Sequence, residues 1–284
     1  MNIRTLQHII PSIATADGGG VKLRRSLGQN QAHRVDPFLM LDEFSSANAD
    51  DYIAGFPEHP HRGFETITYM LDGHMLHQDH LGNRGDLKSG GAQWMTAGRG
   101  IIHSEMPQQE SGRMRGFQLW VNLPAKEKMK PARYQDIQPE AMPWLTLADG
   151  GSVKIIAGNA EFAGQLHAGP IQGISADALF LDVRLPAGSH FELPLTSDYN
   201  AFVYPYEGQA LIGPQLSAQP LASQQAGALS LGDQLEIWAD QPVAFLLLAG
   251  RPIGEAIVQH GPFVMNTQAE IQQAIADYKA GRLV

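Results

Sequence analysis

The stretch QWMTAGRGIIHSEMP, residues 93–107, is the part of the sequence that best indicates the fold class, and it contains two candidate functional residues. It consists of two short apolar runs separated by glycines, Gly98 and Gly100. Runs of this length between glycines are typical of β-strands joined by tight turns. In the second run His103 and Glu105 stand two residues apart, so both side chains project from one face of a strand. The stretch therefore predicts a β-strand that presents an imidazole and a carboxylate side by side.

Short apolar or alternating runs of the same kind recur along most of the chain. Examples are Thr66–Leu71, Phe117–Asn122 and Ser152–Ala157. The 284 residues include 30 glycines and 18 prolines, which is many for a helical protein. With 43% hydrophobic and 17% charged residues, the composition is that of a globular protein with ample material for a core. We expect an all-β fold built from sandwiches or small barrels.

The chain divides into two β-rich blocks that resemble each other. Phe64–Gly73 is an aromatic-rich strand followed by an acidic residue and a turn glycine, and Ala201–Gly208 has the same order of features. A proline-rich stretch from about 124 to 145 separates the blocks. Two related β-domains in tandem are the simplest explanation. We therefore predict a first domain at 1–135, a linker at 136–150 and a second domain at 151–284.

The last residues change to a helical pattern. Thr267 and Glu270 have the spacing of a capping box, and Gly281 is placed where a helix would end. Between them Ile271, Ile275 and Tyr278 recur at helical spacing on one face. We expect an amphipathic C-terminal helix whose role is packing.

Charge and cysteine content exclude several classes of function. The formal charge is −9 and the one basic cluster, Lys22–Arg25, is short, so we expect no direct nucleic-acid surface. The chain has no cysteine, which rules out disulfides, thiolate ligands and thiol catalysis. The N-terminus has no signal-peptide pattern, and no apolar run approaches the ~18 residues that a membrane helix needs. We expect a cytoplasmic protein that has no membrane partner.

A second polar pair lies in EHPHRGFET, residues 58–66. His59 and His61 are again two residues apart and share one face of a strand. Two antiparallel strands would bring them together with His103 and Glu105. Burying four such groups is costly unless hydrogen bonds or a metal ion satisfy them. Imidazoles and a carboxylate without thiolate suit Fe, Mn, Ni, Co, Cu or Zn, so a metal site is the leading interpretation.

Other carboxylates are weaker ligand candidates than Glu105. Glu65 follows His61 by four residues, about 13 Å along a straight strand, so only a chain reversal would bring it to a metal. Glu58 has the opposite strand parity to His59 and is expected to point away.

The remaining histidines have ordinary structural interpretations. The run from His74 through His77 to His80 follows a turn glycine, and we expect it to form the polar end of a hairpin. His167, His190 and His260 are isolated. No nucleophile elbow, P-loop or dinucleotide-binding glycine pattern is present, which argues against serine hydrolases, nucleotide hydrolases and Rossmann enzymes.

Five segments resemble the pirin family of bicupins closely, and the resemblance extends nearly from end to end. These segments are Asp36–Phe44, Phe56–Thr66, Gln93–Pro107, Leu119–Leu123 and Gln259–Asn266. The resemblance implies two tandem cupin barrels, each a double-stranded β-helix or jelly roll, with a few short helices and the C-terminal helix. It also implies one divalent metal ion, with Fe(II) as the native metal, in the N-terminal barrel only. The family's ligands then correspond to His59, His61, His103 and Glu105.

The second block offers no comparable set of ligands. At the positions that the repeat relates to the ligands, it has residues such as Asp198, Asn200, Phe245 and Leu247. We expect a structural barrel there, or one that forms a wall over the active site.

Bacterial members of the family resemble quercetin 2,3-dioxygenases, which implies cleavage of a flavonol such as quercetin by O₂ with release of CO. In that hypothesis Glu105 is the catalytic base that takes the proton of the flavonol 3-hydroxyl. Phe56, Trp94 and Phe117 are candidates for an aromatic wall, and Gln118 and Arg62 for hydrogen bonds around the site. The alternative is an iron-dependent redox sensor that acts through a protein partner, as eukaryotic pirins are described. Another small-molecule cupin enzyme, such as an isomerase, is a third option.

Overall fold

The structure is a computed structural model that describes residues 2–284. β-strands dominate, so the expected all-β, two-cupin fold is confirmed. The described chain forms two compact units, and each contains one large and one small antiparallel sheet. Unit 1 comprises the N-terminal residues through Ile13, together with Ser26–Pro37 and Ala141–Pro252. Unit 2 comprises Ala14–Arg25, Phe38–Glu140 and Ile253–Val284.

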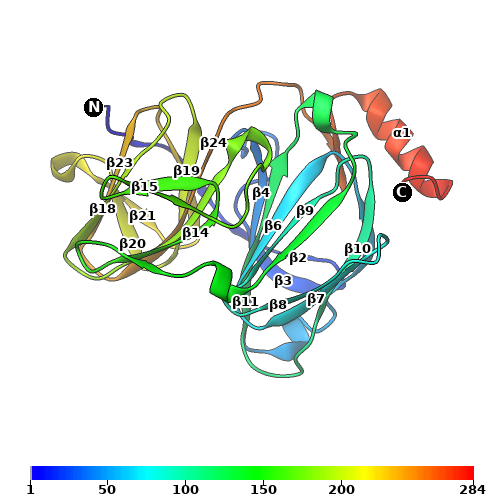
Figure 1. Cartoon of the computed structure of the whole chain (residues 1–284), viewed down its shortest axis with the longest axis horizontal. Coiled ribbons are helices and arrows are strands. Elements are labelled where there is room, and N and C mark those ends of the chain that lie inside the picture. The colour runs from blue at the N-terminus through cyan, green and yellow to red at the C-terminus, as the bar shows by residue number, and fades with distance from the viewer. Residues whose placement is uncertain (1) are drawn as a thin grey trace. The chain divides into compact units, whose positions relative to one another are not determined.

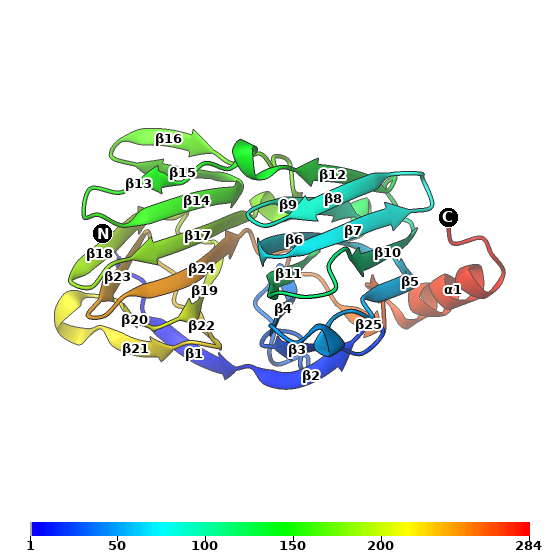
Figure 2. The ribbon, with the colours of Figure 1, turned by 90° about the horizontal axis from the view of Figure 1, so that it is seen from below.

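Unit 2 contains the candidate metal-ligating residues. Its larger sheet has the strand order β12-β9-β6-β11-β4-β3-β2, and its smaller sheet has the order β5-β10-β7-β8 (Figures 1 and 2). The bounds are β2 (Ile13–Asp17), β3 (Val21–Arg25), β4 (Phe38–Ser46), β5 (Phe56–His61), β6 (Phe64–Asp72), β7 (His74–Asp79), β8 (Arg84–Lys88), β9 (Ala92–Thr96), β10 (Ile101–Pro107), β11 (Met114–Asn122) and β12 (Arg133–Ile137). Short 3₁₀ turns lie at Ala49–Asp51 and Ala125–Glu127.

Both sheets of unit 2 contribute to its core. Leu23, Phe44 and Met70 from the larger sheet pack in one buried cluster with Met75 and Leu87 from the smaller sheet. Alternate residues of a strand face opposite sides, so each sheet gives one face to this core.

Unit 1 has the same two-sheet plan. Its sheets have the orders β1-β22-β19-β24-β17-β14-β13 and β18-β23-β20-β21, and β15 pairs with β16. The bounds are β1 (Leu6–Pro11), β13 (Leu145–Thr146), β14 (Ser152–Ala157), β15 (Asn159–Phe162), β16 (Gln165–Ala168), β17 (Leu179–Leu185), β18 (Ser189–Pro194), β19 (Asn200–Glu207), β20 (Gln209–Ile212), β21 (Gln219–Ala222), β22 (Gln225–Leu229), β23 (Gln234–Ala239) and β24 (Val243–Gly250). Two 3₁₀ turns lie at Ser175–Asp177 and Gln215–Ser217, and a third, Pro139–Ala141, lies where the chain passes from unit 2 to unit 1.

The interior of unit 1 is apolar. Phe245 and Leu247, which the sequence repeat relates to ligand positions, are fully buried beside Phe191 and Leu181. Within residues 2–284, both clusters of side chains with metal-ligating spacing belong to unit 2.

The observed units differ from the expected domains 1–135 and 151–284 at both ends of the chain. β1 forms the edge of the large sheet of unit 1 by pairing with β22, although it is the first strand of the sequence. Arg4 is fully buried in unit 1, where it donates hydrogen bonds to the carbonyl oxygens of Gly232, Tyr199 and Thr196. Alternation within a strand does not encode which distant strand it pairs with, so the sequence pattern could not place this segment.

The C-terminal helix was predicted correctly but belongs to unit 2. α1 (Gln268–Lys279) begins at Thr267, and the capping box with Glu270 is present. Its buried Ile271 and Ala274 pack on Phe263 and Met265 around the hairpin of β25 (Val258–His260) and β26 (Phe263–Met265). Figure 1 shows α1 at the C-terminal end of the chain. The helix therefore covers an apolar surface, as its amphipathic pattern requires. None of the helices in residues 2–284 has the length and apolar character needed to cross a bilayer.

A buried lysine fixes the turn that follows His61. Gly63 has φ +92°, and a Cβ added there would collide with the Val264 carbonyl oxygen, so the turn requires glycine. Lys128, 1% exposed, donates from Nζ to the Gly63 oxygen at 2.8 Å, the Asn122 Oδ1 at 2.8 Å and the Val264 oxygen at 3.0 Å. Lys128 thus holds the end of β5 against β26.

Replacing Lys128 with methionine is expected to lower the free energy of unfolding of unit 2 by about 2–4 kcal/mol, because three buried oxygens lose their donor. Urea unfolding at pH 7 measures this, with the exposed Lys126→Met as the matched control. Equal stability of the two variants would contradict the role of Lys128.

The same lysine predicts a pH dependence. Burial lowers the pKa of Lys128 from 10.5 to about 8. Between these values the unfolded chain binds the proton and the folded chain does not, so raising the pH favours the folded state. The free energy of unfolding of the wild type should therefore exceed that of Lys128→Met by a growing amount as the pH rises from about 8 to 10.5.

Candidate metal centre

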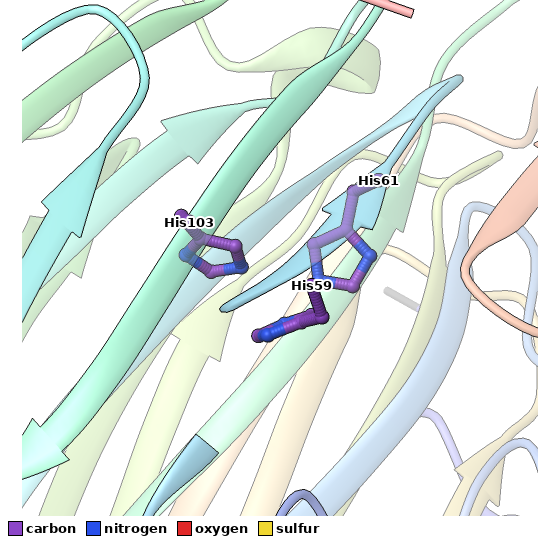
Figure 3. Close-up of side chains that lie close together, drawn as sticks. All are labelled: His59, His61 and His103. Carbon is purple, nitrogen blue, oxygen red and sulfur yellow. The ribbon is translucent and has the colours of Figure 1, made fainter. Parts of the chain in front are cut away.

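Two neighbouring strands of the small sheet bring three histidines together. β5 and β10 pair antiparallel, with His59 directly opposite His103 and His61 opposite Ile101. β10 alternates between buried and half-buried residues, so His103 faces the interior together with Ile101 and Glu105. The ring centroids lie 4.6 Å apart for His59 and His61, 4.3 Å for His59 and His103, and 5.0 Å for His61 and His103 (Figure 3). One ligand nitrogen from each ring lies within 4.8 Å of the other two.

Two of the three imidazoles make a contact through Nδ1. The His59 Nδ1 lies 2.8 Å from the Pro57 carbonyl oxygen. The His103 Nδ1 lies 3.4 Å from the Nδ1 of His77. The His61 Nδ1 and the His103 Nε2 are buried without a hydrogen-bond partner. Histidine ligands of metals usually have the arrangement seen at His103, with one nitrogen in a contact and the other free. The three rings therefore fit a single metal ion.

Burial keeps two of these rings in the form that a metal binds. Desolvation lowers the pKa of His61 well below 6.5, and the neighbouring His59 lowers it further. The pKa of His103 is lowered in the same way, first by burial and then by His61, His59 and His77. Both imidazoles are consequently neutral at pH 7, with a lone pair available for coordination.

The carboxylate of Glu105 lies next to this cluster, but it is close to His103 and His77 and not to all three histidines. Its ligand oxygen lies within 4.8 Å of nitrogens of His77 and His103, and the group of three histidines does not include it. A β-bulge between His103 and Glu105 places Glu105 opposite Phe56, and Glu105 is 2% exposed.

Three side chains orient the Glu105 carboxylate. Oε1 accepts hydrogen bonds from Thr68 Oγ1 at 3.3 Å and from Gln93 Nε2, and Oε2 accepts one from Gln118 Nε2 at 2.9 Å. The indole N–H of Trp120 donates to the Gln118 Oε1 at 3.1 Å. Because an indole can only donate, the amide of Gln118 is fixed with its NH₂ toward Glu105. The expected hydrogen-bonding role of Gln118 near the site is therefore observed.

Glu65, the rival carboxylate, is engaged elsewhere. It is fully buried, and its Oε1 accepts from Thr96 Oγ1 at 2.7 Å and from Lys130 Nζ at 3.0 Å. Glu65 belongs to neither cluster of metal-ligating side chains in residues 2–284. Its contacts are those of an ion pair in which the carboxylate is buried and the lysine is half-buried.

The interpretation of His77 as part of a polar hairpin end was wrong. His77 is 1% exposed, and β7 pairs with β10 so that His77 lies directly opposite Glu105. Its flat face stacks on Tyr134, with centroids 4.1 Å apart and an angle of 12°. Strand parity places His77 on the opposite face of the strand from His74 and His80. Which of the two faces is buried depends on the pairing of β7 with β10, which the sequence pattern does not give.

Three residues considered for the surroundings of the site have other roles. Arg62 donates to the Arg99 carbonyl and pairs with Asp277 of α1 at 2.8 Å, so it fastens the helix instead of bonding to the site. Trp94 and Phe117 are core residues, 2% and 0% exposed.

A pocket with a volume of about 520 Å³ opens onto two of the three histidines. His59, His61 and Gln118 line it, together with the aromatic rings of Phe44, Phe56 and Trp120. Phe56 is thus the member of the predicted aromatic wall that reaches the pocket. The pair of Arg25 with Asp42, 2.7 Å apart, adds a charged section to the lining. This volume lies within the usual range for small-molecule sites.

Comparisons with known proteins agree with this architecture. Residues 20–121 match the family described as Pirin, and residues 180–284 match the Pirin C-terminal cupin domain. The chain is 49% identical over 284 residues to a pirin-like protein of Caulobacter vibrioides, with 99% of this chain and 100% of that protein covered. It is 49% identical over 268 residues to a Pseudomonas aeruginosa protein provisionally named quercetin 2,3-dioxygenase, with 94% of each covered.

A solved structure is similar over the same extent. The crystal structure of quercetin 2,3-dioxygenase from Acinetobacter baumannii superposes with a TM-score of 0.89 at 31% identity, covering 99% of this chain and 98% of that one. Sequence and fold match along nearly the whole length, and so this chain belongs to the pirin family.

Proposed function

We propose that this protein is a metal-dependent dioxygenase that cleaves a flavonol such as quercetin with O₂ and releases CO. The observation that carries the proposal is the pocket of about 520 Å³, whose lining combines aromatic rings with His59 and His61. A planar aromatic molecule fits such a wall by stacking and apolar contact. The dioxygenase names of two similar proteins point to the same substrate class.

His59, His61, His103 and Glu105 would hold one divalent ion, with Fe(II) the expected metal and Zn, Ni, Mn, Co or Cu the alternatives. Three imidazoles and a carboxylate suit these ions. When bound, the metal supplies Lewis acidity and a position for O₂ next to the substrate.

The residues around the pocket have separate tasks in this proposal. Phe44, Phe56 and Trp120 bind the flat substrate and exclude water. The Glu105 carboxylate takes the proton of the 3-hydroxyl, which raises the electron density of the ring that is cleaved. Gln118 reaches from the pocket lining to the Glu105 Oε2 and keeps that oxygen oriented.

Turnover of quercetin tests the proposal. The protein is loaded with Fe(II) without oxygen, quercetin and O₂ are added, and flavonol loss and CO release are followed with His103→Ala as control. We expect flavonol loss and CO in equal amounts with the wild type and background rates with the variant. A fully metal-loaded wild type that is no faster than the variant would contradict the dioxygenase and favour a metal-dependent protein that acts through a protein partner.

A further inference from the structure

We propose that His77 is a positioning residue that sets the tautomer and orientation of His103 through a relay ending at Asp79. The inference rests on the proposed metal centre, in which His103 is a ligand. His77 lies between the two, with its Nδ1 3.4 Å from the His103 Nδ1 and its Nε2 3.3 Å from the Asp79 Oδ2. His77 is 1% exposed, and the side chain of Asp79 is 0% exposed.

Only one arrangement of protons satisfies this relay when a metal is bound. The free nitrogen of His103 is Nε2, which is buried without a partner and would bind the ion with its lone pair. Its proton then lies on Nδ1, which donates to the Nδ1 of His77. His77 must consequently carry its own proton on Nε2, which donates to Asp79. A carboxylate thus fixes the ligand through one intervening imidazole.

Both ends of the relay are held in place. The Asp79 Oδ1 accepts from the backbone N–H groups of Leu81 at 2.9 Å and Asn83 at 3.1 Å, and its Oδ2 also accepts from Asn83 Nδ2 at 2.9 Å. Tyr134 stacks on the His77 ring at 4.1 Å and fixes its plane. His77 can therefore rotate little, and it presents its Nδ1 to His103.

His77 itself is poorly placed to be a ligand. It forms a second possible cluster with His103 and Glu105. Both of its nitrogens, however, already have partners, His103 on one side and Asp79 on the other. Coordination through either nitrogen would break one of these contacts, whereas His103 offers an Nε2 that has none.

The relay predicts a specific order of metal affinities among His77 variants. In His77→Asn the amide oxygen takes the place of Nδ1 and still accepts from His103. In His77→Phe the ring still stacks on Tyr134, but no acceptor is left. Loss of such an outer hydrogen bond typically weakens metal binding about 10- to 100-fold. We expect the wild type to bind most tightly, His77→Asn next, and His77→Phe about tenfold or more weaker than the wild type.

Titration with Co(II), followed by its visible absorption bands, tests this without relying on turnover. Circular dichroism verifies folding, and His77→Gln, whose amide sits at the position of Nε2 and cannot accept from His103, serves as a further variant. If His77→Phe does not fold, Asn should still bind more tightly than Gln. Affinity that follows packing, with Phe equal to the wild type or above Asn, overturns the relay. A wild type that binds no Co(II) contradicts the proposed metal centre instead, so the two failures are distinguishable.

Discussion

Replacing His103 with alanine is expected to abolish stoichiometric metal binding. His103 lies at the centre of the cluster, with ring centroids 4.3 Å from His59, 5.0 Å from His61 and 5.2 Å from His77. Its removal takes away one ligand and the contact to His77 together. Since loss of an outer hydrogen bond alone weakens binding 10- to 100-fold, loss of a ligand should weaken it by about 100-fold or more.

Elemental analysis after dialysis measures this effect. We expect one metal ion per chain for the wild type and none for His103→Ala. The control is His74→Ala, which changes a histidine on the neighbouring β7 that pairs with Asp86 at 3.0 Å and lies outside both clusters. Full metal content in His103→Ala, or loss of metal in His74→Ala, would show that the ion binds elsewhere.

The second large effect is expected at Glu105 and not at Glu65. In Glu105→Gln an NH₂ group replaces one of two oxygens that accept from Gln93, Thr68 and Gln118. A donor would then face a donor, and the metal would lose an anionic ligand. We expect weaker metal binding and turnover of quercetin at the background rate.

Glu65→Gln is the matched control because it makes the same chemical change in another buried carboxylate. It should lose the ion pair with Lys130 and retain a hydrogen bond with Thr96, without loss of metal. Calorimetric titration of both variants with the same metal compares them directly. Retention of metal by Glu105→Gln together with its loss from Glu65→Gln would reverse the assignment.

Strand parity was enough to predict that the three histidines lie close together. His59 and His61, and likewise His103 and Glu105, are related by the two-residue period of a strand, and this relation is local. To predict that β5 pairs with β10, it was enough to assume that their two polar faces meet. In the structure the strands do pair, and His59 lies opposite His103.

Features that depend on long-range pairing could not be predicted from the sequence. The inward position of His77 follows from the register of β7 against β10, which a single strand does not reveal. The pairing of β1 with β22 and the packing of α1 in unit 2 likewise join segments far apart in the chain. The role of Arg62 also depends on a distant segment. Its position next to His61 suggested a hydrogen bond at the site, but its ion-pair partner Asp277 lies in the C-terminal helix.

The position of the bound metal tests whether β5 and β10 build a metal centre in unit 2. A crystal of the Fe(II)-loaded protein, measured at the iron absorption edge, gives an anomalous difference map that locates the ion. We expect one peak about 2 Å from a nitrogen of each of His59, His61 and His103, with an oxygen of Glu105 as a further ligand. A peak coordinated by Glu65, or one outside the three histidines, would contradict it.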